Sequence, residues 1–118
     1  MALRILVAED EFITGSDLCD TFEEAGYEVE GPHAGISSAM LACQKEKPDL
    51  AVLEIELADG LTYELAQKLI EENVPVILHS DMADPLAIAA RFPGATMLAK
   101  PCPPAKLLQT VQRVLVSA

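Results

Sequence analysis

Acidic, hydroxyl and basic side chains stand at or near the ends of apolar, strand-like runs in this chain. They are Glu9, Asp10, Glu11, Glu54, Ser80 and Lys100. In an open parallel sheet, residues that follow the strands gather in the crevice outside the carboxyl ends, where ligands bind. The pattern therefore indicates one shared polar site at an edge of a sheet.

The residue types in this set indicate the chemistry of that site. Converging carboxylates repel each other and raise each other's pKa unless a cation lies between them. An all-oxygen set without histidine or thiolate suits a hard cation such as Mg²⁺, which takes one or two carboxylates plus phosphate oxygens. Lys100 adds a point charge and Ser80 a hydroxyl donor, and both suit a phosphoryl group. The set predicts phosphoryl transfer onto, or off, a carboxylate.

Each of these residues also has an ordinary structural explanation. The acids at 9–11 suit a solvated helix N-terminus, and Ser80 suits a helix cap or a turn. Glu54 has the alternative of an inert side chain at a strand end, reaching the surface or stabilised by Lys100. His79 lies in a buried strand, where we expect a hydrogen-bonded core residue.

Composition narrows the class of protein. The chain has 118 residues, the size of one domain, and we expect a single domain over 1–118. Nineteen acidic and eight basic side chains give a net charge of −11, which argues against nucleic-acid binding. Three separated cysteines indicate reduced thiols, and no apolar stretch approaches the span of a bilayer. These features predict a cytoplasmic protein with no membrane or nucleic-acid partner.

Apolar strand-like runs alternate along the chain with amphipathic helical patterns. We expect strands at 3–8, 27–32, 50–55, 74–79 and 96–99. Helical patterns follow at 13–25, 36–43, 63–72, 85–91 and from 104 onward. Five such βα units predict a doubly wound α/β fold, a five-stranded parallel sheet with helices on both faces.

Four segments carry a family resemblance. They are Arg-Ile-Leu-Val-Ala-Glu-Asp-Glu at 4–11, Pro-Asp-Leu-Ala-Val-Leu-Glu-Ile at 48–55, Pro-Val-Ile-Leu-His-Ser at 75–80 and Leu-Ala-Lys-Pro at 98–101. In type, order and spacing they resemble the four sequence blocks of bacterial response regulator receiver domains. The resemblance implies a flavodoxin-like sheet of strand order 2-1-3-4-5 and a role in two-component or phosphorelay signal transduction.

The resemblance also implies roles for individual residues. Glu54 stands at the phosphoacceptor position, where the family has an aspartate. Glu9 and Asp10 would bind Mg²⁺ together with Glu54 and the backbone carbonyl of Glu56. Because the acceptor side chain is one methylene longer than aspartate, we expect this Mg²⁺ site to be weakened.

Further roles fall at the last two blocks. Ser80 and Lys100 would contact the phosphoryl group, and Pro101 is the candidate for a cis proline. Met97 stands at the switch position, where the family usually has Tyr or Phe. Three other departures from the family pattern are Ala58, Thr62 and Cys102.

These observations lead to one main hypothesis and two alternatives. The main one is a stand-alone receiver domain, not an enzyme, that acts by protein contact. Its partners would be a histidine kinase or phosphotransfer protein and a downstream protein, and the face of the fourth helix, fifth strand and fifth helix is a candidate contact or homodimer surface. We favour a pseudo-receiver, because Glu54 partly imitates phospho-aspartate, over slow phosphorylation. The alternatives are a small Mg²⁺-dependent phosphatase or phosphotransferase that uses the same acids, and a metal-free interaction module.

Overall fold

The strand-like runs form one parallel sheet in the computed structural model, which describes residues 2–81 and 85–117. The strands are β1 (Arg4–Ala8), β2 (Glu28–His33), β3 (Leu50–Leu53), β6 (Val76–Ser80) and β7 (Ala95–Ala99). Their order is β2-β1-β3-β6-β7, which is 2-1-3-4-5 when the strands of this sheet are counted along the chain. The predicted fold class is confirmed.

Burial follows the position of each strand in the sheet. Every residue of β3 and β6 is buried, and in β1 only Arg4 is not. A central parallel strand is covered on both faces, which explains why these runs are continuously apolar. The edge strand β2, by contrast, carries exposed residues at Glu28, Gly31 and Pro32.

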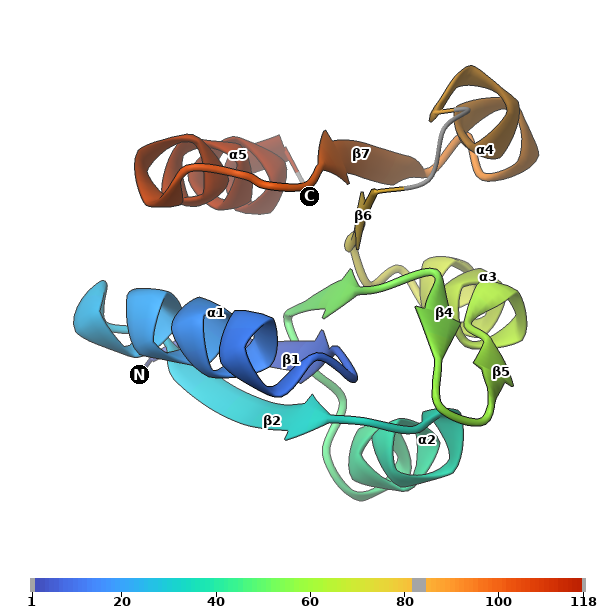
Figure 1. Cartoon of the computed structure of the whole chain (residues 1–118), viewed down its shortest axis with the longest axis horizontal. Coiled ribbons are helices and arrows are strands. Elements are labelled where there is room, and N and C mark those ends of the chain that lie inside the picture. The colour runs from blue at the N-terminus through green and yellow to red at the C-terminus, as the bar shows by residue number, and fades with distance from the viewer. Residues whose placement is uncertain (1, 82–84, 118) are drawn as a thin grey trace.

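Helices cover both faces of the sheet (Figure 1). They are α1 (Phe12–Glu24), α2 (Ile36–Lys45), α3 (Tyr63–Glu71), α4 (Pro85–Arg91) and α5 (Pro104–Ser117). One core cluster joins the sheet to α1 and α5 and includes Phe22, Val52 and Leu107. The other joins it to α2, α3 and α4 and includes Leu65 and Leu78. Within the described residues, no helix is long and apolar enough to span a bilayer.

The segment after β3 differs from the expectation. The predicted strand over 50–55 ends at Leu53, and a short antiparallel hairpin of β4 (Glu56–Leu57) and β5 (Gly60–Leu61) follows. Thr62 closes this hairpin onto the chain, because its backbone N–H donates to the carbonyl of Ile55 at 2.8 Å and its hydroxyl donates to that of Glu54 at 2.8 Å. Glu54 therefore lies just past the strand, not within it.

Candidate functional site

The carboxyl ends of the strands surround a cavity of about 300 Å³. Residues that follow β1, β3, β6 and β7 line it, together with residues of the hairpin. They are Asp10, Glu11, Glu54, Glu56, Leu61, Asp81 and Lys100. Parallel strands bring these positions to one edge of the sheet, so the sequence expectation of a shared polar site is met in this part of the fold.

The ammonium of Lys100 lies at the centre of the acidic residues. Its Nζ is 2.5 Å from Oε2 of Glu54, 2.7 Å from Oε1 of Glu9 and 3.0 Å from Oε1 of Glu11. Burial alone would lower the pKa of Lys100, but the hydrogen bonds to Glu54, Glu9 and Glu11 outweigh it and raise that pKa. The lysine is therefore a permanent cation in this site.

Glu9 is the most deeply buried acid of the set, with 3% of its surface exposed. Burial raises the pKa of its carboxyl, and the contact with Lys100 and a backbone hydrogen bond oppose that effect. The hydrogen bond comes from the N–H of Glu11, which donates to Oε2 of Glu9 at 3.3 Å. The carboxylate of Glu9 thus has one oxygen directed to the lysine and the other to the start of α1.

Glu54 is held at both ends. Its backbone N–H donates to the carbonyl of Ala8 at 2.9 Å, and the hydroxyl of Thr62 donates to its own carbonyl. In the side chain, Oε2 contacts Lys100, while Oε1 accepts the N–H of Ile55 at 2.7 Å. Both carboxylate oxygens of Glu54 therefore already have partners within the protein.

Two of the acids that the resemblance assigns to a divalent ion, Glu9 and Glu54, contact a lysine in this structure. Among residues 2–81 and 85–117, no group of three or more His, Cys, Asp or Glu side chains is placed to hold a metal ion. Glu9 and Glu54 each direct an oxygen at Lys100, whereas Asp10 and Glu56 lie exposed at the cavity. Lys100 supplies the positive charge that converging carboxylates need. The expected Mg²⁺ site of Glu9, Asp10, Glu54 and the Glu56 carbonyl stays a prediction.

The remaining predicted residues lie around this centre. Ser80 is the buried last residue of β6, and its carbonyl accepts the N–H of Lys100 at 2.9 Å. The peptide bond between Lys100 and Pro101 is cis. Met97 packs, half-buried, against the core cluster under α2, α3 and α4, and it does not line the acidic cavity. Sequence reasoning assigned no role to Asp81, which lines the cavity directly after Ser80.

A second cavity adjoins the site and includes His79. It has a volume of about 460 Å³ and lies between α1 and the segment from Lys100 to Leu107. His79 is 4% exposed, and neither ring nitrogen has a hydrogen-bond partner within the described parts of the chain. Among the described residues, the expectation of a hydrogen-bonded core histidine is therefore not met, because none of the acidic, hydroxyl or apolar side chains that share this cavity bonds to the ring.

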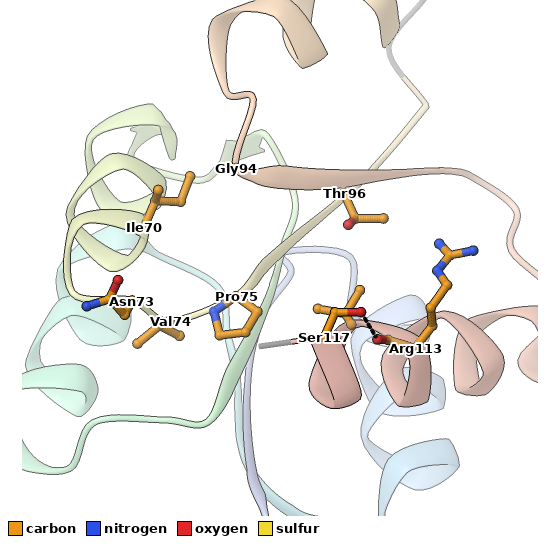
Figure 2. Close-up of a pocket in the computed structure, with 9 residues that line it drawn as sticks. Ile70, Asn73, Val74, Pro75, Gly94, Thr96, Arg113 and Ser117 are labelled. Atoms are coloured by element: carbon orange, nitrogen blue, oxygen red, sulfur yellow. Dashed lines mark hydrogen bonds between the residues drawn. The ribbon is translucent and has the colours of Figure 1, made fainter.

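A third cavity lies at the opposite, amino end of the sheet (Figure 2). Its volume is about 450 Å³, and its lining comes from the end of α3, the start of β6 and β7, and the end of α5. Figure 2 shows Arg113 and Ser117 on α5, where the Ser117 hydroxyl donates to the Arg113 carbonyl at 2.9 Å. None of the predicted site residues lines this cavity.

Comparison with known proteins identifies the class. Residues 5–112 match the sequence pattern of the response regulator receiver domain. The chain therefore belongs to the response regulator receiver domain family, the phosphorelay modules of two-component signalling.

Two curated relatives extend beyond this chain. The transcriptional regulatory protein PdtaR of Mycobacterium tuberculosis is 31% identical over 114 residues, which cover 92% of this chain and 55% of the relative. The phyllosphere-induced regulator PhyR of Methylorubrum extorquens is 30% identical over 118 residues, which cover 98% of this chain and 44% of the relative. The chain thus spans about half the length of the curated relatives it matches.

Solved structures agree with the family assignment. A CheY-like receiver domain protein from Methanospirillum hungatei has a TM-score of 0.89 at 25% identity, over 99% of this chain and 96% of that one. The receiver domain of PhyR from Erythrobacter litoralis has a TM-score of 0.86 at 26% identity, over 98% of this chain and 91% of that one. Both resemble this chain over nearly its full length.

Proposed function

We propose that this receiver domain works without phosphorylation, as a protein-binding module whose Glu54–Lys100 ion pair holds the site in one state. The observation that carries the proposal is the 2.5 Å contact between Lys100 Nζ and Glu54 Oε2. The family's acceptor aspartate carries a shorter carboxylate, and phosphorylation extends its negative charge outward, whereas Glu54 places its carboxylate one methylene farther out, in contact with Lys100. Glu54 keeps a carboxylate there permanently, with less charge and fewer oxygens than a phosphoryl group.

The same contacts make Glu54 a poor phosphoacceptor. A nucleophilic carboxylate needs a free oxygen in line with the donor, but Oε2 of Glu54 faces Lys100 and Oε1 accepts the N–H of Ile55. The additional methylene also moves the carboxylate by about 1.5 Å. A displacement near 1 Å can cost about a hundredfold in a positioned reaction. Geometry and occupancy of the oxygens both disfavour transfer.

The proposal extends to partners. We propose that a histidine kinase or a phosphotransfer protein contacts the domain without transferring a phosphoryl group, and that a downstream protein binds the state that the ion pair maintains. The face formed by α4, β7 and α5 is the surface we propose for that partner or for a homodimer, and it carries an exposed Leu86, 81% of whose surface is accessible. Such binding would not change on treatment with a phosphodonor.

The proposal also excludes enzymatic turnover. A phosphatase or phosphotransferase at this site would need a carboxylate free to act as nucleophile or general base. Glu9 and Glu54, the two buried acids of the site, both contact Lys100. We therefore expect no steady release of phosphate from a phosphate ester, and sustained turnover would favour the enzyme alternative.

The deciding experiment compares Glu54→Asp with Glu54→Gln. Each protein is incubated with acetyl phosphate and Mg²⁺ and weighed intact. We expect no adduct on the natural chain or on Glu54→Gln, which keeps the length and removes the charge. Glu54→Asp should gain one phosphoryl group, because the shorter acid withdraws from Lys100 and frees an oxygen. A phosphoryl adduct on the natural chain that maps to Glu54 contradicts the proposal.

A titration with Mg²⁺ tests the metal site separately. We expect the backbone amide signals of Asp10 and Glu54 to change little in the natural chain, because Lys100 already occupies the centre of the acids. In Glu54→Asp the same signals should shift and saturate. Saturable shifts of equal affinity in both proteins would show that the lysine does not exclude the ion.

A further inference from the structure

The cavity next to His79 has the features of a built ligand site. Its volume of about 460 Å³ lies in the range of small-molecule pockets, and it opens between α1 and the loop that leads into α5. Glu54, the acceptor position, does not line this cavity. The two cavities share Glu11, Asp81 and Lys100, but the α1 side and His79 belong to this one alone.

His79 is the observation that points to a ligand. The imidazole is 4% exposed and lines the cavity, and among the residues that the structure describes neither of its nitrogens has a hydrogen-bond partner. Leaving a buried polar group unpaired is costly, so such groups are normally paired. Burial, followed by the charge of Lys100, lowers the pKa of His79, and the ring is therefore neutral near pH 7. A neutral imidazole offers one acceptor and one donor.

The charges around the cavity determine whether it favours a positively or a negatively charged ligand. Three carboxylates, from Glu11, Asp17 and Asp81, line the cavity, against the one ammonium of Lys100. That ammonium is already in contact with three glutamates. The charge that remains at the wall is negative, which favours a cation and disfavours phosphate or carboxylate ligands.

The other lining residues favour a ligand with an apolar part. Leu18 and Leu107 are buried side chains of α1 and α5, and they give the cavity an apolar wall. No metal ion is indicated, because across the described residues no three His, Cys, Asp or Glu side chains are placed to bind one. Apolar walls with a few acidic groups and one hydrogen-bonding ring suit an organic ammonium ion better than an inorganic cation.

We propose that the cavity between α1 and the β7–α5 loop binds a small organic amine. Its ammonium group lies at the acidic rim of Asp17 and Asp81, its apolar body lies against Leu18 and Leu107, and His79 pairs with a polar hydrogen of the ligand. The site is separate from any acceptor chemistry at Glu54, so it stands whether or not the domain is phosphorylated.

Benzylammonium is the probe, with benzyl alcohol and phenylacetate as neutral and anionic counterparts of similar shape. Each is titrated into the full chain while backbone amide signals are followed by NMR. For a ligand of this size we expect a Kd on the order of 1 mM, with saturable shifts at Thr14, His79 and Cys102. Benzyl alcohol should bind more weakly, and phenylacetate should not saturate.

Variants separate the charges of the cavity from the general charge of the protein. Asp17→Asn should weaken benzylammonium about threefold, and Asp17→Asn with Asp81→Asn about tenfold, as expected for partly screened charges. Asp20→Asn removes the same charge from the same helix outside the cavity and should change the affinity less than twofold. His79→Leu should weaken the ligand further while keeping the apolar wall.

Three results would overturn the proposal. They are equal binding of benzyl alcohol and benzylammonium, an equal effect of Asp17→Asn and Asp20→Asn, and the absence of saturable shifts at the cavity. If His79→Leu fails to fold, the comparison of Asp17→Asn with Asp20→Asn on α1 still decides the question, because both aspartates are exposed. Phosphorylation of the natural chain would refute the function proposed above and leave this result unaffected.

Discussion

A single basic side chain meets three glutamates at each end of the parallel sheet. At the amino end, the guanidinium of Arg4 in β1 lies 2.8 Å from Glu28, 2.8 Å from Glu30 and 3.4 Å from Glu46. At the carboxyl end, Lys100 lies within 3.0 Å of all three of its glutamates. The two clusters have the same composition of charges, and they differ in their access to water.

Exposure separates the two clusters. The partners of Arg4 have side chains that are 56%, 33% and 63% exposed, so water screens each pair. Around Lys100, the side chains of Glu9 and Glu54 are only 1% and 8% exposed. A charge removed from water is stable only when an oppositely charged partner lies beside it. Such groups concentrate at functional sites. The exposed cluster ties the edge strand β2 to β1, whereas the buried one defines the site.

The largest expected effect comes from removing each cation while keeping its apolar stem. Lys100→Met should lower the free energy of unfolding by about 3–5 kcal/mol, because it leaves buried carboxylates unpaired. Arg4→Met is the matched control and should cost about 1 kcal/mol, since water solvates its glutamates. Urea unfolding near neutral pH, followed by circular dichroism, measures both. Equal losses would show that exposure does not distinguish the clusters.

The next effect concerns the hydroxyl that supports the backbone behind Glu54, in the Lys100 cluster. Thr62 is fully buried, and its hydroxyl donates to the carbonyls of Glu54 at 2.8 Å and of Ile55 at 3.2 Å. Thr62→Val removes this donor and should cost about 1–3 kcal/mol. Thr62→Ser keeps the donor and should lose only about 0.8 kcal/mol for the missing methyl group.

Unfolding in urea gives these energies, and the amide signal of Glu54 reports on the site itself. That signal should move in Thr62→Val and stay close to its natural position in Thr62→Ser. If valine leaves both the stability and the signal unchanged, the hydroxyl is not a support for the acceptor segment.

The pH dependence should have opposite signs in the two clusters. In the folded chain, burial raises the pKa of Glu9 above its ordinary 4.5, so its stability contribution is complete below that pH and is lost as the pH rises through the raised value. The hydrogen bond from His33, ahead of the charge of Arg4, lowers the pKa of Glu30. Its contribution is present above 4.5 and is lost as the pH falls through the lowered value.

Neutral isosteres at these two positions test the signs. Near pH 7, Glu9→Gln should leave the protein as stable as the natural chain or more stable, whereas Glu30→Gln should destabilise it. Both differences should shrink toward acid pH, and unfolding curves from about pH 3 to pH 8 measure them. If Glu30→Gln stabilises the protein, or Glu9→Gln strongly destabilises it, the two clusters do not have the opposite pH dependences expected here.

Much of the fold could be predicted from the sequence, because central strands covered on both faces leave continuous apolar runs. The position of Lys100 beside Glu54 also follows from residue types at strand ends. The hairpin of Glu56–Leu57 and Gly60–Leu61 could not be predicted, since strands of two residues have no periodicity to detect. The family pattern drew attention to Thr62, but its hydrogen bonds to the preceding segment appear only in the folded chain.

The partners of the charged residues were harder to predict than their positions. Residue type and spacing indicated no partner for Arg4. Its contact with Glu28 depends on the register of β1 against β2, in which Arg4 is paired with Glu28. The environment of His79 likewise depends on α1 and the loop after β7, which are distant in sequence. Sequence spacing places a side chain at a strand end but does not fix what lies opposite it.

The smallest expected effect is also the most exact control on the comparison. Glu11 in the Lys100 cluster and Glu46 in the Arg4 cluster both have side chains that are 63% exposed, at 3.0 Å and 3.4 Å from their cations. Glu11→Gln and Glu46→Gln should each cost at most about 0.5 kcal/mol, because an exposed ion pair is screened whichever cluster it belongs to. Urea unfolding of both variants at low and high salt measures this. If Glu11→Gln costs several times more than Glu46→Gln, then membership of the buried cluster, and not the exposure of the individual carboxylate, determines the strength of the pair.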